Sequence, residues 1–410
     1  MQIFTTAWIK QMHAMGVSRL AVLGALITTG VSANAVIPLV AQQEITTILN
    51  SSLSYQFFLN NVTLISLPFL IGSLVLLGNK RNQQIGQIGF AILAFLNMLL
   101  YLTNLQWHPL ILRSLIGVVF GLTTPIGQFS LAVAELNPSE RVKQFTMMLN
   151  LVAAGLAIVP FIGIAILWIG NGNVSLLFLF LALLSAVLSL LSRLWIPPRE
   201  RICAPSIKSL LIPKKNLLVV IGDAVVIILT RSIYAFVLVW LSSTISNFSS
   251  LQMISLCFTA PFVVWGFLAI PLLKLLKPMI SFGSFVIFPI ILLGLSVGIS
   301  EITWLPFALF FIALLSIPEA FTPGQLISQW KTASGRQFGN VFTMALMTLC
   351  LAIGPAIFEL ITYLGYTWPI MSPGSPFNKS LWFSLVSLPI GLGIVLGFWR
   401  KYLIPSLRRS

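Results

Sequence analysis

Five charged side chains lie inside long apolar runs of the sequence, where a charge is costly and therefore informative. Four of them, Arg113, Asp223, Arg231 and Glu319, are candidates for a function, whereas Glu359 stands near the outer end of its run and is interpreted as interfacial. A charged residue at the centre of a bilayer costs about 2.5–3.5 kcal/mol on insertion scales, and such residues usually bind an ion, a proton or a polar ligand. The chemistry that these side chains predict is reversible binding, and we expect them to couple or bind a substrate inside the protein.

Two of these charges share one stretch, GDAVVIILTRS (222–232). On an α-helix, Asp223 and Arg231 would lie about 80° apart around the axis and about 12 Å apart along it, so they cannot form one direct ion pair. We expect Arg231 to face a central cavity, with a structural ion pair as the alternative. Asp223 either couples a proton or substrate, or lies at the membrane interface. Glu319 is a candidate proton-binding group and also a candidate partner of Arg231.

The sequence contains no pattern typical of an enzyme. It has no GxxxxGK[ST] loop for nucleotide phosphates, no HExxH and no GxSxG motif, and no cluster of His, Cys and acidic residues for metal or nucleophile chemistry. The three cysteines, Cys203, Cys257 and Cys350, form neither a disulfide framework nor a CxxC metal site. We therefore expect no catalytic residue, no cofactor and no bound metal.

The composition is that of a helical membrane protein. Of 410 residues, 58% are hydrophobic and only 8% are charged, against about 25% charged in an ordinary soluble domain. Apolar runs long enough to cross about 30 Å of hydrocarbon recur along the whole chain. We expect about twelve transmembrane helices, at 18–41, 57–77, 85–104, 109–134, 142–168, 173–195, 217–242, 251–273, 279–299, 304–329, 337–364 and 380–399.

The basic residues predict how the chain is oriented. The net charge of +15 arises from Lys and Arg that stand singly in short loops, which argues against nucleic acid as a partner. Nearly all of them fall on one side of the predicted spans, and the loops of the other side contribute only Lys379. Because cytoplasmic loops are rich in Lys and Arg, both termini are predicted to be cytoplasmic. We expect a multi-pass protein of the cytoplasmic (inner) membrane, surrounded by lipid.

The chain is duplicated internally. TPIGQ (124–128) corresponds to TPGQ (322–325), and Arg141 precedes a proline by 19 residues, as Arg336 does. The predicted fold is thus all-α, with two pseudo-symmetric six-helix bundles of parallel topology, which in transporters move relative to each other around a central substrate site. The predicted parts are a cytoplasmic lead-in at 1–17, bundles at 18–195 and 217–400, a cytoplasmic linker at 196–216 and a tail at 401–410.

Two glutamines occupy equivalent positions in the duplicated segments. Gln128 and Gln325 each end their copy of the motif. They could donate hydrogen bonds to a substrate across the central cavity, or they could join neighbouring helices. The sequence leaves both interpretations open.

Three local motifs resemble those of the major facilitator superfamily of transporters. GSLVLLGNKRNQQ (72–84) resembles the gating-loop signature of that superfamily at Gly72, Lys80 and Arg81, but Leu76 replaces its acid. RSLIG (113–117) matches the R-x-x-x-G pattern of drug/proton antiporters.

The third motif, GLAIVPFIG (155–163), is similar to the antiporter motif at Gly155, Pro160 and Gly163. Residues of these types bend a helix and let neighbouring helices approach closely. In the superfamily this motif is associated with export.

Within the superfamily, LRSLIG (112–117) and the stretch from about 131 to 168 resemble the MdfA-type multidrug/proton antiporters. These carry two acids in the first span, the second of them four residues before a proline. Here Asn34 stands four residues before Pro38, and Leu26 occupies the first acid position. Both proton-binding acids of the family are therefore missing, which counts against proton-driven drug export. Asn34 is retained as a candidate site residue because of its position.

The resemblance implies secondary active transport by alternating access. The first hypothesis is proton-coupled export of a small drug-like or amphipathic compound by a monomer. The second is transport of an anionic or zwitterionic metabolite such as a carboxylate siderophore, which Arg113 and Arg231 favour. A non-transporting membrane sensor is the alternative from another class of protein.

Overall fold

A computed structural model describes residues 19–49, 52–77, 82–133, 136–195, 217, 219–224, 227–228 and 316–367. Within these ranges every regular element is helical. By its internal contacts the chain divides into two units, of which the first contains residues 1–212 and 327–348 and the second contains 213–326 and 349–410. Most of the described residues belong to the first unit, so the packing reported below is that of the first unit.

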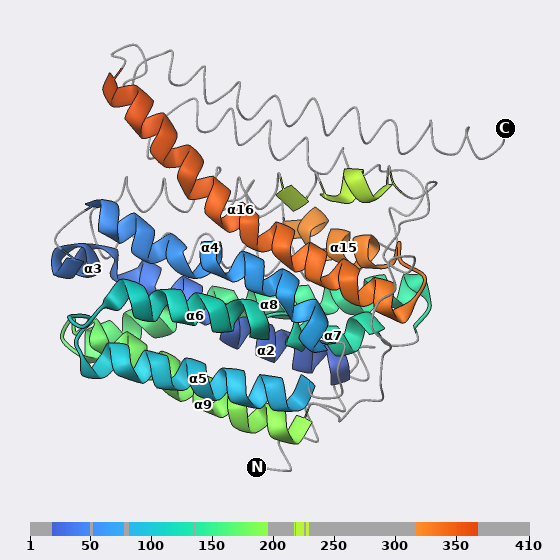
Figure 1. Cartoon of the computed structure of the whole chain (residues 1–410), viewed down its shortest axis with the longest axis horizontal. Coiled ribbons are helices and arrows are strands. Elements are labelled where there is room, and N and C mark those ends of the chain that lie inside the picture. Colours follow the sequence, from blue (N-terminus) through green and yellow to red (C-terminus); the bar gives the residue numbers. More distant parts are fainter. Residues whose placement is uncertain are drawn as a thin grey trace. The chain divides into compact units, whose positions relative to one another are not determined.

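The N-terminal segments fold as eight α-helices and one 3₁₀ helix (Figure 1). The elements are α2 (Arg19–Val36), η1 (Ile37–Ala41), α3 (Gln42–Leu49), α4 (Ser52–Leu77), α5 (Asn82–Leu102), α6 (Pro109–Thr123), α7 (Ile126–Val133), α8 (Pro138–Ile169) and α9 (Ser175–Trp195). In the described part of the second sequence half, the elements are α15 (Ser316–Ile327) and α16 (Ala333–Thr367).

Two of the predicted spans are interrupted in the structure. The span predicted at 18–41 changes from α2 to the 3₁₀ helix η1, and the span predicted at 109–134 divides into α6 and α7. Pro38 and Pro125 stand at these interruptions. Proline has no backbone N–H and its ring clashes with the carbonyl four residues earlier, which breaks or bends a helix.

Within the described ranges, five helical segments are long and apolar enough to cross a membrane. They are Arg19–Val36, Gln84–Leu102, Pro109–Phe129, Glu140–Ile169 and Ser175–Ser192. These segments support a multi-pass membrane protein and agree with five of the first six predicted spans. The spans predicted at 251–273, 279–299 and 380–399 lie outside the described residues, as does most of 217–242.

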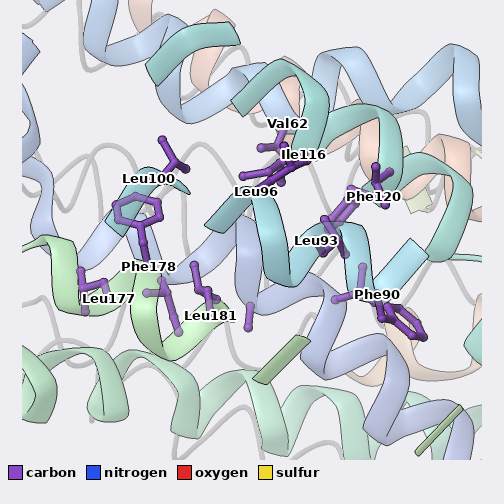
Figure 2. Close-up of a cluster of buried hydrophobic side chains, with 14 of the residues drawn as sticks. Val62, Phe90, Leu93, Leu96, Leu100, Ile116, Phe120, Leu177, Phe178 and Leu181 are labelled. Atoms are coloured by element: carbon purple, nitrogen blue, oxygen red, sulfur yellow. The ribbon is translucent and has the colours of Figure 1, made fainter. Parts of the chain in front are cut away.

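The core of the first unit forms where α4, α5, α6 and α9 meet. The most extensive helix contacts are those of α5 with α9 and of α4 with α6, followed by α2 with α8. Figure 2 shows Val62 of α4, Leu96 of α5, Ile116 of α6 and Phe178 of α9 in one apolar cluster, all of them buried. This packed side of the bundle is the scaffold on which the polar residues of α2 and α6 are held.

The glycines of the antiporter-like motif in α8 have different surroundings. A Cβ at Gly155 would lie 2.5 Å from Cγ2 of Thr29, so a glycine is needed for α8 to approach α2 this closely. At Gly163 a Cβ would meet Val40 at 3.5 Å, an ordinary contact distance. Pro160 lies inside α8, which continues as one helix to Ile169.

Candidate functional site

The site is built around the carbonyl group that Pro38 leaves without its helical donor. In a regular helix the N–H of residue 38 would donate to the carbonyl of residue 34, but proline has no N–H. Nη1 of Arg113, which comes from α6, donates to the Asn34 carbonyl oxygen instead, over 2.9 Å. The guanidinium therefore joins α6 to the end of α2 at the point where the sequence interrupts that helix.

Asn34 is connected through its side chain to a third helix. Its Nδ2 donates within α2 to the Val31 carbonyl over 3.2 Å, which leaves its Oδ1 as an acceptor. Nδ2 of Asn97, in α5, donates to that oxygen over 2.8 Å and also to the Leu93 carbonyl over 2.9 Å. Arg113, Asn34 and Asn97 thus form one buried network across α2, α5 and α6.

The guanidinium of Arg113 is completely buried, with 0% of the residue exposed. Its Cζ lies 4.9 Å from the ring centroid of Phe58, at a distance where an aromatic face stabilises a cation. Among the described residues, its Nε and Nη2 have no hydrogen-bond acceptor. The structure records no ion pair between this cation and an acid within the described ranges.

This arrangement is suited to binding a carboxylate. Nε and Nη2 of an arginine form a planar fork that matches the two oxygens of a carboxylate or two oxygens of a phosphate. Nη1 is held by Asn34 and the ring of Phe58 lies against the cation, so the orientation of the group is fixed by two neighbours. Oδ1 of Asn97 also has no donor among the described residues, so it could accept a hydrogen bond from a ligand hydroxyl or ammonium group.

The fold that carries this network is also found in solved structures of transporters. No model of a protein family matches the sequence, and no curated protein matches it. The crystal structure of a major facilitator superfamily transporter, FucP, in the outward conformation matches with a TM-score of 0.65 and 12% identity, over 93% of this chain and 98% of that one. The chain has the major facilitator fold.

A second solved structure supports the same assignment of the fold. The crystal structure of the human organic anion transporter MFSD10 (TETRAN) matches with a TM-score of 0.63 and 13% identity, over 91% of this chain and 97% of that one. At these identities the likeness is one of fold. The network of Arg113 and Asn34 lies in the first sequence half of the chain.

Several predicted site residues lie elsewhere or outside the described ranges. Arg231, Lys80 and Arg81 are outside them, and Glu319 is placed only as a residue of α15. Gly72 lies near the end of α4, where a Cβ would meet no atom within 4 Å. The role of these residues therefore stays a prediction.

Three further polar residues among the predicted site residues are described. Asp223 is a buried carboxyl in the second unit. Gln128 of α7 is buried, and its Nε2 has no hydrogen-bond acceptor among the described residues. Gln325 of α15 is half-buried and does have an interaction partner.

Two residues of the site were not predicted from the sequence. Asn97 stands in the apolar run AILAFLNMLLYL (91–102) and Phe58 in another such run. A polar residue within an apolar span is a signal that could have selected Asn97. Phe58 has no such signal, because the chain contains 30 phenylalanines.

The hydrogen bond between Asn34 and Asn97 can be tested by a double-mutant cycle. We expect Asn97→Ala alone to lower the free energy of unfolding by about 1–3 kcal/mol, because Oδ1 of the buried Asn34 loses its donor. Asn34→Ala in the same background should cost less than in the wild type, since its partner is already absent. Denaturant unfolding of the purified protein measures both effects. Strictly additive effects of the two substitutions would contradict the network.

Proposed function

We propose that this protein is a secondary active transporter that carries a small organic anion across the membrane by alternating access, with Arg113 as the group that binds the anion. The observation that carries the proposal is the buried guanidinium, whose Nε and Nη2 have no acceptor among the described residues. A cation buried in this way is stabilised when an anion binds to it, and a bidentate carboxylate would use both nitrogens.

Electrostatics argue against a cationic cargo at this position. Two like charges at close range repel each other strongly where the effective dielectric constant is low. Neither Asn34 nor Asn97 carries a charge that could compensate for the guanidinium. One of the matching structures is that of a human organic anion transporter, which supports the same class of cargo for this chain. A carboxylate metabolite, including a carboxylate siderophore, belongs to this class.

Proton-coupled export of drug-like or amphipathic compounds is the second candidate function. The buried carboxyl of Asp223 favours it, since a buried acid in a transporter fold is a candidate proton carrier. Because Asn34 cannot bind a proton as the family acid does, coupling would depend on Asp223 and Glu319 in the second sequence half. This proposal also includes four predictions made from the sequence. They are a location in the cytoplasmic membrane, cytoplasmic termini, twelve spans and a monomeric state.

Transport in proteoliposomes separates the two candidates. We expect labelled carboxylates to be taken up and their neutral amides to be excluded. If protons are coupled, a pH gradient should change the rate several-fold, and Asp223→Asn or Glu319→Gln should remove that change. Anion flux that ignores the gradient and survives both substitutions would exclude proton coupling through these residues. Ligand binding without flux under any gradient would instead favour a membrane sensor.

A further inference from the structure

A second buried asparagine, Asn61 of α4, lies beside the Arg113 network. Its Nδ2 donates to the Leu110 carbonyl over 2.9 Å and to Oγ of Ser114 over 2.7 Å, and both of these residues belong to α6. Phe58, whose ring lies against the guanidinium of Arg113, is one turn earlier on α4 and therefore on the same face of that helix. Asn61 thus faces the segment of α6 that carries Arg113.

Backbone carbonyls fix the orientation of the two asparagine amides, those of Asn61 and Asn97. A carbonyl oxygen only accepts hydrogen bonds, so the amide atom that contacts it must be Nδ2. Nδ2 of Asn61 contacts the Leu110 carbonyl over 2.9 Å. Nδ2 of Asn97 contacts the Leu93 carbonyl, also over 2.9 Å. The other atom of each amide, Oδ1, is therefore an acceptor, and neither oxygen has a donor among the described residues.

The unpaired groups around Arg113 are of two complementary kinds. Nε and Nη2 of Arg113 are donors, whereas Oδ1 of Asn61 and Oδ1 of Asn97 are acceptors. They come from three helices, and α6 packs against both α4 and α5. In the part of the chain that the structure describes, these donors and acceptors do not bond to one another. A ligand that offers oxygens to the guanidinium and hydroxyl groups to the amides would satisfy both kinds at once.

Burial makes the two amide oxygens sensitive to small differences between ligands. Arg113, Asn61 and Asn97 are each at most 1% exposed. Buried polar groups are nearly always paired, and a hydrogen bond is stronger where water is excluded. A site that hydrogen-bonds a ligand hydroxyl therefore rejects the analogue that lacks it, because the acceptor is then left unpaired. Discrimination between similar anions would arise at these oxygens.

The charge of the site favours a hydroxyl over an ammonium group as the donor to these oxygens. An ammonium would place a second positive charge near the guanidinium, where the two would repel each other. No acid among the described residues pairs with Arg113, whose Nη1 donates to a backbone carbonyl. A hydroxyl group is neutral and donates one hydrogen bond.

We propose that the transported anion is a hydroxycarboxylate, whose carboxylate binds Arg113 and whose hydroxyl groups donate to Oδ1 of Asn61 and Oδ1 of Asn97. This inference rests on the proposed transport of an organic anion and specifies which anions are carried. Asn61 and Asn97 are then the residues that determine specificity, because they contact the hydroxyl groups that distinguish one carboxylate from another.

Binding of matched acids to the wild-type protein tests this inference. Malate and succinate differ by one hydroxyl group, as do citrate and tricarballylate, and aspartate has an ammonium group in place of the malate hydroxyl. Isothermal titration calorimetry of the protein in mild detergent measures each Kd. We expect at least one hydroxy acid to bind at least about tenfold more tightly than its deoxy counterpart, which leaves a buried acceptor unpaired. Aspartate should bind more weakly than malate.

The ratio of the two Kd values in the preferred pair shows whether the asparagines are responsible. Asn61→Leu and Asn97→Leu each remove one acceptor and keep a side chain of similar size. We expect at least one of them to reduce the ratio to less than about twofold by weakening the hydroxy acid alone. A structural defect would weaken both acids equally and leave the ratio unchanged.

Ser66→Ala is the matched control for these variants. Ser66 is also completely buried in α4, but its Oγ donates within that helix, to the Thr63 carbonyl over 2.7 Å. We expect this substitution to leave the ratio as it is in the wild type. A loss of the ratio in Ser66→Ala as well would show that any disturbance of α4 removes the preference, and it would overturn the role of Asn61.

Three further outcomes would overturn the inference. One is equal binding of the hydroxy and deoxy acids in every pair. Another is a preference for aspartate over malate, which would indicate an amino acid as the cargo. The third is a ratio that neither asparagine variant changes. If one variant does not fold, the other variant and the wild-type series still decide. Absence of binding by every carboxylate, or binding that persists in Arg113→Met, would instead mean that the proposed function itself is wrong.

Discussion

Replacing Arg113 by methionine is expected to reduce transport at least about 100-fold while the protein remains about as stable as the wild type. Removal of the charge relieves a cost of about 2.5–3.5 kcal/mol for a cation inside the membrane. The same substitution removes the donor to the Asn34 carbonyl, which costs about 1–3 kcal/mol for a buried group. The two terms nearly cancel, so loss of function without loss of stability is the expected signature.

Flux in proteoliposomes and thermal unfolding of the same preparation measure these two quantities. Arg113→Lys serves as the control, since it keeps the charge and one donor but not the planar fork. We expect this variant to be folded and to retain only a small part of the flux. A methionine variant that unfolds well below the wild-type temperature would indicate that Arg113 is a structural residue. Undiminished flux in that variant would rule out a role in transport.

Gly121→Leu is expected to prevent the first sequence half from folding. A Cβ at Gly121 would overlap the carbonyl oxygen of Ser66 and would lie 2.9 Å from Cβ of Phe69, both in α4. Gly117, one turn earlier, is similarly close, because a Cβ there would lie 3.0 Å from the Val62 carbonyl oxygen. Overpacking a well-packed core already costs about 1–3 kcal/mol where side chains can adjust. Here backbone would have to move, and the contact between α4 and α6 would open.

The yield of monodisperse protein after extraction in mild detergent measures this effect. Gly72→Leu is the matched control, because Gly72 lies in α4, one of the two helices of this contact, but a Cβ there would meet no atom within 4 Å. We expect the control to be obtained at the wild-type yield and the Gly121 variant to aggregate. Equal yields for the two variants would show that the close approach of α4 and α6 is not required.

The sequence predicted the elements of the first half well, because long apolar runs are a strong signal for membrane helices. The predicted runs at 57–77 and 85–104 correspond to α4 and α5. The interruptions at Pro38 and Pro125 were not included in the predicted spans, although the missing N–H of proline is visible in the sequence. Mean hydropathy is averaged over a whole run, so one proline that interrupts the helix hardly changes its value.

The candidate site could be predicted only in part. Arg113 and Asn34 were selected from motif positions, and the structure brings them together. The contact uses the Asn34 carbonyl, however, and not its side chain. No pattern in the sequence predicts which carbonyl a distant guanidinium will reach. Asn97 enters the site because α5 packs against the other helices. Contacts of this kind between distant helices cannot be predicted from one sequence.

Arg113 stands near the outer end of its predicted span, where an arginine side chain can extend to the membrane interface or turn into the protein. The structure instead buries the guanidinium between the Asn34 carbonyl and the ring of Phe58. Position along an apolar run could not distinguish these alternatives, because a long side chain near a helix end can point either way. The acceptor freed by Pro38 is the physical reason for the inward orientation.

Counterflow tests the central claim, that Arg113 binds the carboxylate of a transported anion, most directly. Proteoliposomes are loaded with a high concentration of an unlabelled carboxylate and diluted into a trace of the same labelled compound, across a panel of aromatic, di- and tricarboxylic acids and their neutral amides. The wild type is expected to accumulate label for at least one acid and none of the matching amide, and Arg113→Met is expected to lose this accumulation. Equal accumulation of acid and amide, or accumulation that persists in the folded Arg113→Met protein, would contradict this claim.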